Sequence, residues 1–255
     1  MSRRALVLAL AVTLVAVACE GSASSDDDRE LTVAAAASLT AAFTQIGADF
    51  QEETGVAVVF TFGPSDGLAT QIVEGAPVDV FASASPAWMD AISERGPGVR
   101  RRTNFARNRL AVIVPADNPA NIHELDDLVS EGVQLVLAAQ GVPAGDYARE
   151  ILANAGIADA ALANVVSNEE DVAGVVTKVL IGEADAGIAY VTDVRAEVAG
   201  RISVVGIPDD VNVIATYPIA VMADSGRPDI AREFVEFVLG PGQGVLADHG
   251  FLPAE

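Results

Sequence analysis

Two serines stand in short turns where an apolar run ends and a helical pattern begins. Ser38 follows the run 31–36, and Ser65 follows the run 56–62. A third turn of this kind, 141–147, contains Pro-Ala-Gly. Hydroxyl groups and the first N–H groups of a helix are uncharged hydrogen-bond donors, so the three turns together suit an anion. The simpler interpretation of either serine is that it caps its own helix.

The second turn also supports a different chemistry. Gly63–Gly67 fits the G-x-S-x-G pattern of a hydrolase nucleophile, in the strand–turn–helix context that this motif requires. Such a serine needs a base, and the chain has only His123 and His249. One strand–helix unit precedes the turn, no glycine-rich oxyanion loop lies upstream, and His249 is typical of a helix end. An exported hydrolase that depends on Ser65 therefore remains a weaker alternative.

Composition excludes several classes of protein. The chain has 255 residues, of which 51% are hydrophobic, and its 15 basic and 36 acidic residues give a net charge of −21. Such a charge repels phosphate backbones, so nucleic acid is not an expected partner. One cysteine permits no intrachain disulfide, and two unclustered histidines favour no metal site. Neither a cofactor cradle nor a general acid–base pair emerges, so we expect no catalytic residue and no cofactor.

The amino terminus is typical of an exported protein. Arg3 and Arg4 precede the apolar run Ala5–Ala18, which is too short to span a bilayer and predicts a signal peptide over 1–18. Small residues lead directly to Cys19, as in a bacterial lipoprotein cleavage site, so we predict lipidation of Cys19. An ordinary secretory signal with an incidental cysteine is the alternative. The polar stretch 19–30 predicts a flexible tether.

The elements that must position the serines alternate along the chain from Leu31. Apolar runs predict strands at 31–36, 56–62, 78–82, 110–114, 133–138, 164–167, 186–190 and 217–222. Helical periodicity predicts helices before Gly55, before Gly75, after Ser85 and at 122–129, 144–155, 169–182, 193–199, 228–239 and 242–248. This alternation predicts an α/β fold with mainly parallel sheets, in which ligands bind at the carboxyl ends of strands.

The turns, taken in order, resemble a known family. The chain from about Leu31 to Phe251 is similar to the molybdate-binding proteins of ATP-binding-cassette importers. The resemblance rests on the segments Thr32–Thr40, Gln71–Ala84, Trp88–Asp90, Val142–Gly145, Glu170–Val172, Gly187–Tyr190, Gly240–Gln243 and Gly250–Leu252. Each segment alone is weak, and the set in this order and spacing is specific.

The resemblance implies a type II periplasmic-binding-protein fold, with two α/β lobes and a ligand cleft between them. Lobe 1 would comprise 31–107 and 216–255, and lobe 2 would comprise 108–215. The implied ligand contacts are hydroxyl and backbone donors at Ser38 and Ser65, backbone N–H donors at Ala144 and Val172, and the phenol of Tyr190. The implied function is capture of molybdate, and also tungstate, by a monomer that delivers it to a membrane permease and ATPase.

Neutral donors are physically sufficient for such a ligand. Helix N-termini supply a compensating field, so a tetrahedral dianion needs no lysine or arginine in the cleft. A site that offers only donors favours molybdate, tungstate or sulfate over protonated phosphate. Two residues depart from the family's pattern. Asp66 would favour hydrogen phosphate if its carboxylate faced the ion, whereas it is harmless if it points to solvent, and Pro64 removes a nearby N–H donor. A phosphate or sulfate binder thus stays open, whereas a ferric-iron binder is disfavoured because Tyr147, Tyr190 and Tyr217 are far apart in the sequence.

Overall fold

Strands and helices alternate through most of the chain, as the apolar pattern predicted. The computed structural model describes residues 30–194, 198 and 200–254. The predicted signal peptide, Cys19 and nearly all of the predicted tether lie outside the described residues. Within those residues, no helix is both long enough and apolar enough to cross a membrane.

The strands are β1 Glu30–Ala36, β2 Ala57–Gly63, β3 Val80–Ala82, β4 Val99–Pro115, β5 Leu135–Ala138, β6 Val165–Glu169, β7 Ala186–Tyr190, β8 Ile202–Val205, β9 Ile214–Met222 and β10 Leu252–Pro253. The α-helices are α1 Thr40–Thr54, α2 Ser65–Val73, α3 Pro86–Arg95, α4 Pro143–Asn154, α5 Ala158–Ala163, α6 Val172–Leu180, α7 Pro228–Leu239 and α8 Gly242–Asp248. Three short 3₁₀ helices also occur in the described residues: η2 Ala37–Leu39, η3 Leu125–Val129 and η4 Val191–Asp193.

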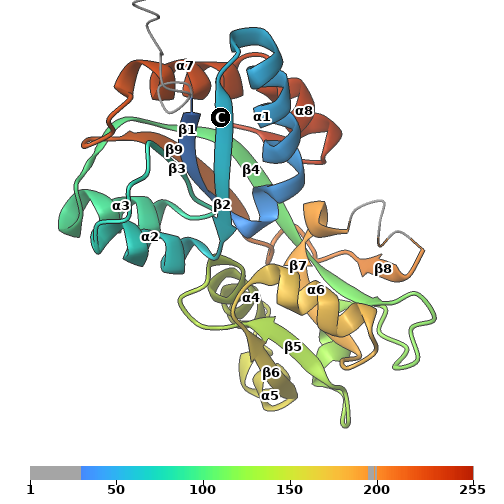
Figure 1. Ribbon diagram of the computed structural model, residues 1–255. Coiled ribbons are helices and arrows are strands. Elements are labelled where there is room, and N and C mark those ends of the chain that lie inside the picture. The colour runs from blue at the N-terminus through green and yellow to red at the C-terminus, as the bar shows by residue number, and fades with distance from the viewer. Residues whose placement is uncertain (1–29, 195–197, 199, 255) are drawn as a thin grey trace, which may run out of the picture.

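The strands lie in the order β2-β1-β3-β9-β4-β7-β5-β6, and β8 and β10 also pair with β4. Figure 1 shows β4 running from one half of the molecule into the other. Its residues up to Arg109 pair with β9, and its residues from Leu110 onward pair with β7. The two halves are therefore joined through one long strand, and the carboxyl ends of β1 and β2 face the second half.

The prediction of mainly parallel sheets was only partly right. The pairs β1–β2, β1–β3, β5–β6 and β5–β7 are parallel. Every other pair is antiparallel and involves β4 or β9. The first part of β4 escaped the sequence analysis because it is rich in arginine, and exposed arginines on an open sheet face leave no apolar run to read.

Several predicted elements differ in type or length. The predicted helix at 122–129 is the 3₁₀ helix η3, and the start of the predicted helix at 193–199 falls in η4. Strands β8 and β10 and the short helix α5 had no predicted counterpart. These elements are short or largely exposed, so their sequences carry little periodic apolar signal.

The core of the first half is built around aromatic side chains on α1. The Phe43 ring lies 5.6 Å from Phe105, and the Phe50 ring lies 5.3 Å from Phe234 on α7, measured between centroids. Figure 1 shows α1, α7 and α8 on one side of this sheet and α2 and α3 on the other. Burial of the apolar helix faces against the sheet fixes the positions of β1 and β2, and hence of the turns that follow them.

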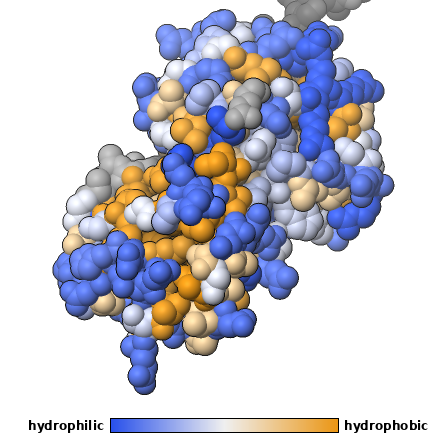
Figure 2. Space-filling model, turned by 180° about the vertical axis from the view of Figure 1, so that it is seen from behind, coloured by the Kyte–Doolittle hydropathy of each residue, from blue (hydrophilic) through white to orange (hydrophobic). Residues whose placement is uncertain are grey.

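The two halves differ in surface character. Figure 2, seen from behind, shows apolar surface gathered on the lower half and a mainly hydrophilic upper half. In the stretch of sequence after β4 and before β9, the exposed large apolar side chains are Val129, Leu162, Val166, Ile181 and Val204. The two α/β halves therefore present different surfaces to solvent.

Candidate functional site

One small cavity lies between the two halves. From the first half it is lined by Ala36, Ala37, Ser38, Gly63, Pro64, Ser65 and Ala84, and from the second by Val142, Pro143, Ala144, Asp171, Val172 and Tyr190. Its volume is about 20 Å³. Such a space holds one small ion and no extended organic solute. All five residues expected to bind a ligand line this cavity.

Ser38 lies inside η2 and does not cap a helix. The turn makes no side-chain capping bond, and the Ser38 Oγ instead lies 2.9 Å from the hydroxyl of Tyr217 on β9. Ser38 is 5% exposed. The Ser38 hydroxyl therefore contacts Tyr217 of the sheet, and the residue lines the cavity. The capping interpretation is wrong for this residue.

Ser65 is the first residue of α2 and is also not a capping residue. The helix has Pro64 as its N-cap, with no side-chain capping bond. The Ser65 Oγ accepts a hydrogen bond of 3.0 Å from the backbone N–H of Ala84, which follows β3. One lone pair of the hydroxyl is thereby used, and its proton is available to a ligand in the cavity.

Ala144 and Val172 stand at the starts of α4 and α6. The first N–H groups of a helix have no acceptor within that helix, so both starts present donors and a positive partial charge to the cavity. Gly145 permits this placement of α4. A Cβ at Gly145 would lie 2.2 Å from the carbonyl oxygen of Ala139 and 2.3 Å from that of Ala138.

Tyr190 ends β7 and is 1% exposed. Its hydroxyl oxygen is buried and has no hydrogen-bond partner in the part of the chain that the structure describes. Burial raises the pKa of the Tyr190 phenol well above its ordinary value of 10, so the group stays protonated. A buried hydroxyl without a partner is costly, and a ligand that accepts its proton removes that cost.

The cavity contains no basic side chain. None of its lining residues is lysine or arginine, and the acid among them is Asp171. The Asp171 carboxylate accepts a 2.8 Å hydrogen bond from the N–H of Gly174 and so caps α6. Asp66 does not line the cavity; its side chain is half-buried, and its Oδ1 has no partner within the described residues. Pro64 does line the cavity.

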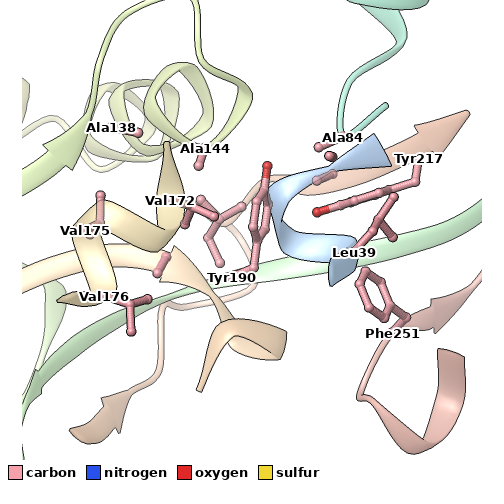
Figure 3. Packing of buried hydrophobic residues seen from close by; sticks show 14 of the residues in the cluster. Leu39, Ala84, Ala138, Ala144, Val172, Val175, Val176, Tyr190, Tyr217 and Phe251 are labelled. Atoms are coloured by element: carbon pink, nitrogen blue, oxygen red, sulfur yellow. The ribbon is translucent and has the colours of Figure 1, made fainter. Parts of the chain in front are cut away.

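A buried polar network supports Ser38 from below. Tyr217 and Asn108 are both fully buried, and the Asn108 Nδ2 lies 3.4 Å from the Tyr217 hydroxyl and 2.8 Å from Thr192 Oγ1. Figure 3 shows Tyr190 and Tyr217 on opposite sides of the turn after β1. Their ring centroids lie only 5.9 Å apart. Distance along the sequence was therefore a poor argument about the tyrosines.

Two hydrogen bonds join the halves beside the cavity. The indole N–H of Trp88, on α3, donates to the carbonyl oxygen of Gly141 at 2.9 Å. The Tyr147 hydroxyl, on α4, donates to the carbonyl oxygen of Ala84 at 3.4 Å. The structure thus holds the two halves closed over the cavity.

The hydrolase alternative finds no base next to Ser65. His249 pairs with Gln45 at 3.2 Å, His123 is exposed, and neither lines the cavity. Within the described residues, no group of three or more His, Cys, Asp or Glu side chains is placed to hold a metal ion.

Sequence reasoning missed the residues that act through others. Ala84 contributes only its backbone N–H, which donates to Ser65. Gly145 contributes only by having no side chain where α4 approaches β5. Asn108 stands between Arg107 and Arg109 in β4, and Tyr217 follows the half-buried Thr216 in β9. Because two arginines flank Asn108, the sequence carries no signal of its burial.

Comparison with known proteins agrees with this geometry. The family described as bacterial extracellular solute-binding proteins matches residues 31–252. The molybdate-binding protein ModA of Mycobacterium tuberculosis is 40% identical over 225 residues, which cover 88% of this chain and 84% of that protein. Among solved structures, the periplasmic molybdate-binding protein of Azotobacter vinelandii superposes with a TM-score of 0.75 at 21% identity, covering 88% of this chain and all of the other. The sulfate-binding protein SubI of M. tuberculosis has a TM-score of 0.78 at 18% identity, covering 89% and 87%. The predicted α/β periplasmic-binding-protein fold is confirmed.

Proposed function

Because the chain belongs to the bacterial extracellular solute-binding protein family, we propose that it captures molybdate, and also tungstate, outside the cytoplasm and delivers it to an importer. In this proposal the hydroxyl groups of Ser38, Ser65 and Tyr190 donate hydrogen bonds to the anion. Ala144 and Val172 donate their backbone N–H groups. The receiving partners are the permease and the ATPase of an ATP-binding-cassette importer.

The observation that carries the proposal is the meeting of five donors in one cavity. They come from four helix starts and a strand end that are far apart in the sequence, and one of them, the Tyr190 hydroxyl, is buried without a partner. A molybdate ion has four acceptor oxygens and no proton, so it satisfies each donor. Its charge is balanced by the positive ends of η2, α2, α4 and α6.

The absence of basic residues from the lining of the cavity fits a transport role. A dianion held by neutral dipoles is bound tightly and can still leave when the halves open, because no ion pair has to be broken. The strongly acidic surface repels the ion at long range, so association is expected to speed up with added salt.

The fold alone does not select molybdate, since a sulfate-binding protein shares it. Selection of molybdate is supported by the 40% identity to a molybdate-binding protein. Donor-only chemistry disfavours protonated phosphate, and cavity size would separate molybdate and tungstate from the smaller sulfate. We assign no catalytic role to Ser65.

We further propose that the protein is an exported monomer anchored by lipid on Cys19. Support comes from the charged, apolar and small-residue pattern of residues 1–19. Mass spectrometry of the mature amino terminus tests this proposal, and the variant Cys19→Ala should release the protein from the membrane fraction. An unmodified Cys19 in membrane-purified protein would contradict it.

The lobes in this proposal are 31–107 with 216–255, and 108–215, and they move about β4 and β9, the two strands in which the lobe boundaries fall. Support comes from the change of partner strand along β4 at Arg109 and Leu110, close to the proposed boundary.

Calorimetric titration of the purified protein with molybdate, tungstate, sulfate and phosphate tests the ligand. We expect one-to-one binding of molybdate and tungstate and much weaker heat from the others. Ligand at about a hundred times its Kd should stabilise the fold by roughly 2.7 kcal/mol, which raises the melting temperature. Tight binding of phosphate, or no binding of any oxyanion, would contradict the proposal.

A further inference from the structure

We propose that Asn108 and Tyr217 fix the direction of the hydrogen bond at Ser38, so that Ser38 keeps its own proton for the bound anion. The two residues would then be positioning residues that make the cavity selective for oxyanions without a proton. This inference rests on the proposed function, since it concerns how the same cavity chooses among oxyanions.

The chain of hydrogen bonds has a fixed starting point at Asn108. The backbone N–H of Arg109 donates to the Asn108 Oδ1 at 2.9 Å, which identifies that atom as the carbonyl oxygen. The amide nitrogen is therefore the atom that faces Thr192 and Tyr217. An amide nitrogen only donates hydrogen bonds, so the Tyr217 hydroxyl oxygen accepts one from Asn108 and cannot donate to it.

Ser38 is the best-placed acceptor for the proton of Tyr217. The Tyr217 hydroxyl lies 2.9 Å from Ser38 Oγ and 3.4 Å from Asn108 Nδ2, whereas the neighbouring Tyr190 hydroxyl lies outside hydrogen-bond geometry. Burial raises the pKa of the Tyr217 phenol far above its ordinary value of 10, so the phenol is protonated at neutral pH. A buried O–H without an acceptor is costly, and hence Tyr217 donates to Ser38.

The direction of this bond decides what Ser38 can offer. If Ser38 donated to Tyr217, only lone pairs of its Oγ would remain for the cavity. Because Tyr217 donates, the Ser38 proton is free and can point at a ligand oxygen. Ser65 is supplied in the same way by the Ala84 N–H, so both serines keep their protons.

This arrangement separates ligands by protonation and not by size. Molybdate, tungstate and sulfate carry no proton at neutral pH, so each of their oxygens accepts. Hydrogen phosphate carries one O–H, which needs an acceptor in the cavity. A serine that can turn its lone pair toward the ligand would supply that acceptor, and Tyr217 makes this orientation unfavourable.

The variant Tyr217→Phe tests the inference, because phenylalanine preserves the packing of the ring and removes only the hydroxyl. Competition titrations at a slightly alkaline pH, where phosphate is mainly a dianion, give the Kd of molybdate, sulfate and phosphate. We expect the preference for molybdate over phosphate to fall about tenfold in this variant. The preference for molybdate over sulfate should not change, since neither ion carries a proton.

A second variant, Asn108→Asp, should reverse the chain. A carboxylate oxygen facing Tyr217 accepts the phenol proton, so Ser38 must donate to Tyr217 and shows only lone pairs to the ligand. The preference for molybdate over phosphate should fall further than in Tyr217→Phe, while the molybdate-to-sulfate ratio again reports any effect of the added charge. The matched control is Tyr147→Phe, which removes a phenol beside the cavity that has no bond to Ser38.

The results separate this inference from the proposed function. If the wild-type protein does not bind molybdate, the proposed function fails and the inference fails with it. If the wild type binds molybdate but Tyr217→Phe weakens molybdate, sulfate and phosphate by one common factor, the proposed function stands and the inference is overturned. An unchanged preference in both Tyr217→Phe and Asn108→Asp overturns it as well. Tyr147→Phe should leave both ratios unchanged, and a fall in the phosphate ratio there would also count against the inference.

Discussion

At the scale of single residues, the partners of a hydroxyl decide its role. Ser38 and Ser65 both stand where helix caps are common, yet neither caps a helix. Each instead meets a polar group from another strand or turn, Tyr217 in one case and the Ala84 N–H in the other. Tyr190 is the opposite case, a buried hydroxyl with no partner within the described residues.

Tyr190→Phe should separate stability from binding. Removing a buried hydroxyl without a partner leaves the free energy of unfolding of the ligand-free protein unchanged or slightly higher. Loss of a donor to a charged ligand should weaken the binding free energy of molybdate by about 1.5–3 kcal/mol, which raises the Kd roughly tenfold to a hundredfold. Urea unfolding and calorimetry measure the two quantities. A less stable variant with unchanged affinity would show that the hydroxyl has a structural partner.

The buried tyrosines also predict a pH dependence. Burial raises the pKa of Tyr190 and Tyr217, so the folded chain holds these phenol protons more tightly than the unfolded chain does. Stability from this source is fully present below pH 10, the ordinary tyrosine value, and is lost as pH rises above it. Urea unfolding from about pH 8 to about pH 11 should show the decline, and Tyr217→Phe should show a shallower one. Equal slopes in the two proteins would argue against this origin.

At the scale of elements, the site depends on how closely helix starts approach the strand ends. The start of α4 lies directly over the end of β5, and Gly145 leaves no room there for a side chain. The start of α6 is fixed by its own cap, Asp171. Such contacts place backbone N–H groups, which no side-chain pattern in the sequence reports.

Gly145→Ala should disturb this approach. Its Cβ would meet two backbone carbonyl oxygens, and backbone cannot move aside as a flexible side chain can. We expect a loss of about 1–3 kcal/mol in the free energy of unfolding together with weaker molybdate binding. Gly244→Ala is the matched control, because a Cβ there meets nothing within 4 Å and α8 should be slightly stabilised. Equal stability of the two variants would refute the close-approach argument.

At the scale of the whole molecule, the two halves meet across the cavity through Trp88 and Tyr147. Both side chains donate to backbone carbonyls of the opposite half, so these bonds exist only while the halves are closed. Trp88 is the only tryptophan of the chain, and its indole therefore reports on this contact alone.

Opening and closing should be visible in the fluorescence of Trp88. In an open form the indole N–H would turn to water, so we expect molybdate to change the emission with the same saturation curve as calorimetry. Trp88→Phe should lose this signal, so its Kd is measured by calorimetry, and we expect that Kd to rise about threefold to tenfold. Binding heat without any change in wild-type emission would mean that the contact persists in both forms.

Much of the fold could be predicted because its signals are local. Apolar runs located the strands β1, β2 and β7. Gly55 marked the end of α1, and Pro228 marked the start of α7. The first part of β4 could not be found in this way, since its arginines face solvent and its pairing is with a strand more than a hundred residues away.

The sequence by itself determined the alternation of elements and the turns that carry Ser38, Ser65 and Ala144, because each depends on residues close together in the chain. Only the tertiary structure decided that Ser38, Ser65, Ala144, Val172 and Tyr190 line one small cavity and that Tyr217 contacts Ser38. Those facts depend on strand order and on the close approach of helices, and both are set by packing between segments far apart in sequence. In the proposed network, the direction of the hydrogen bond between Tyr217 and Ser38 is set by Asn108, which lies 109 residues from Tyr217 in the sequence.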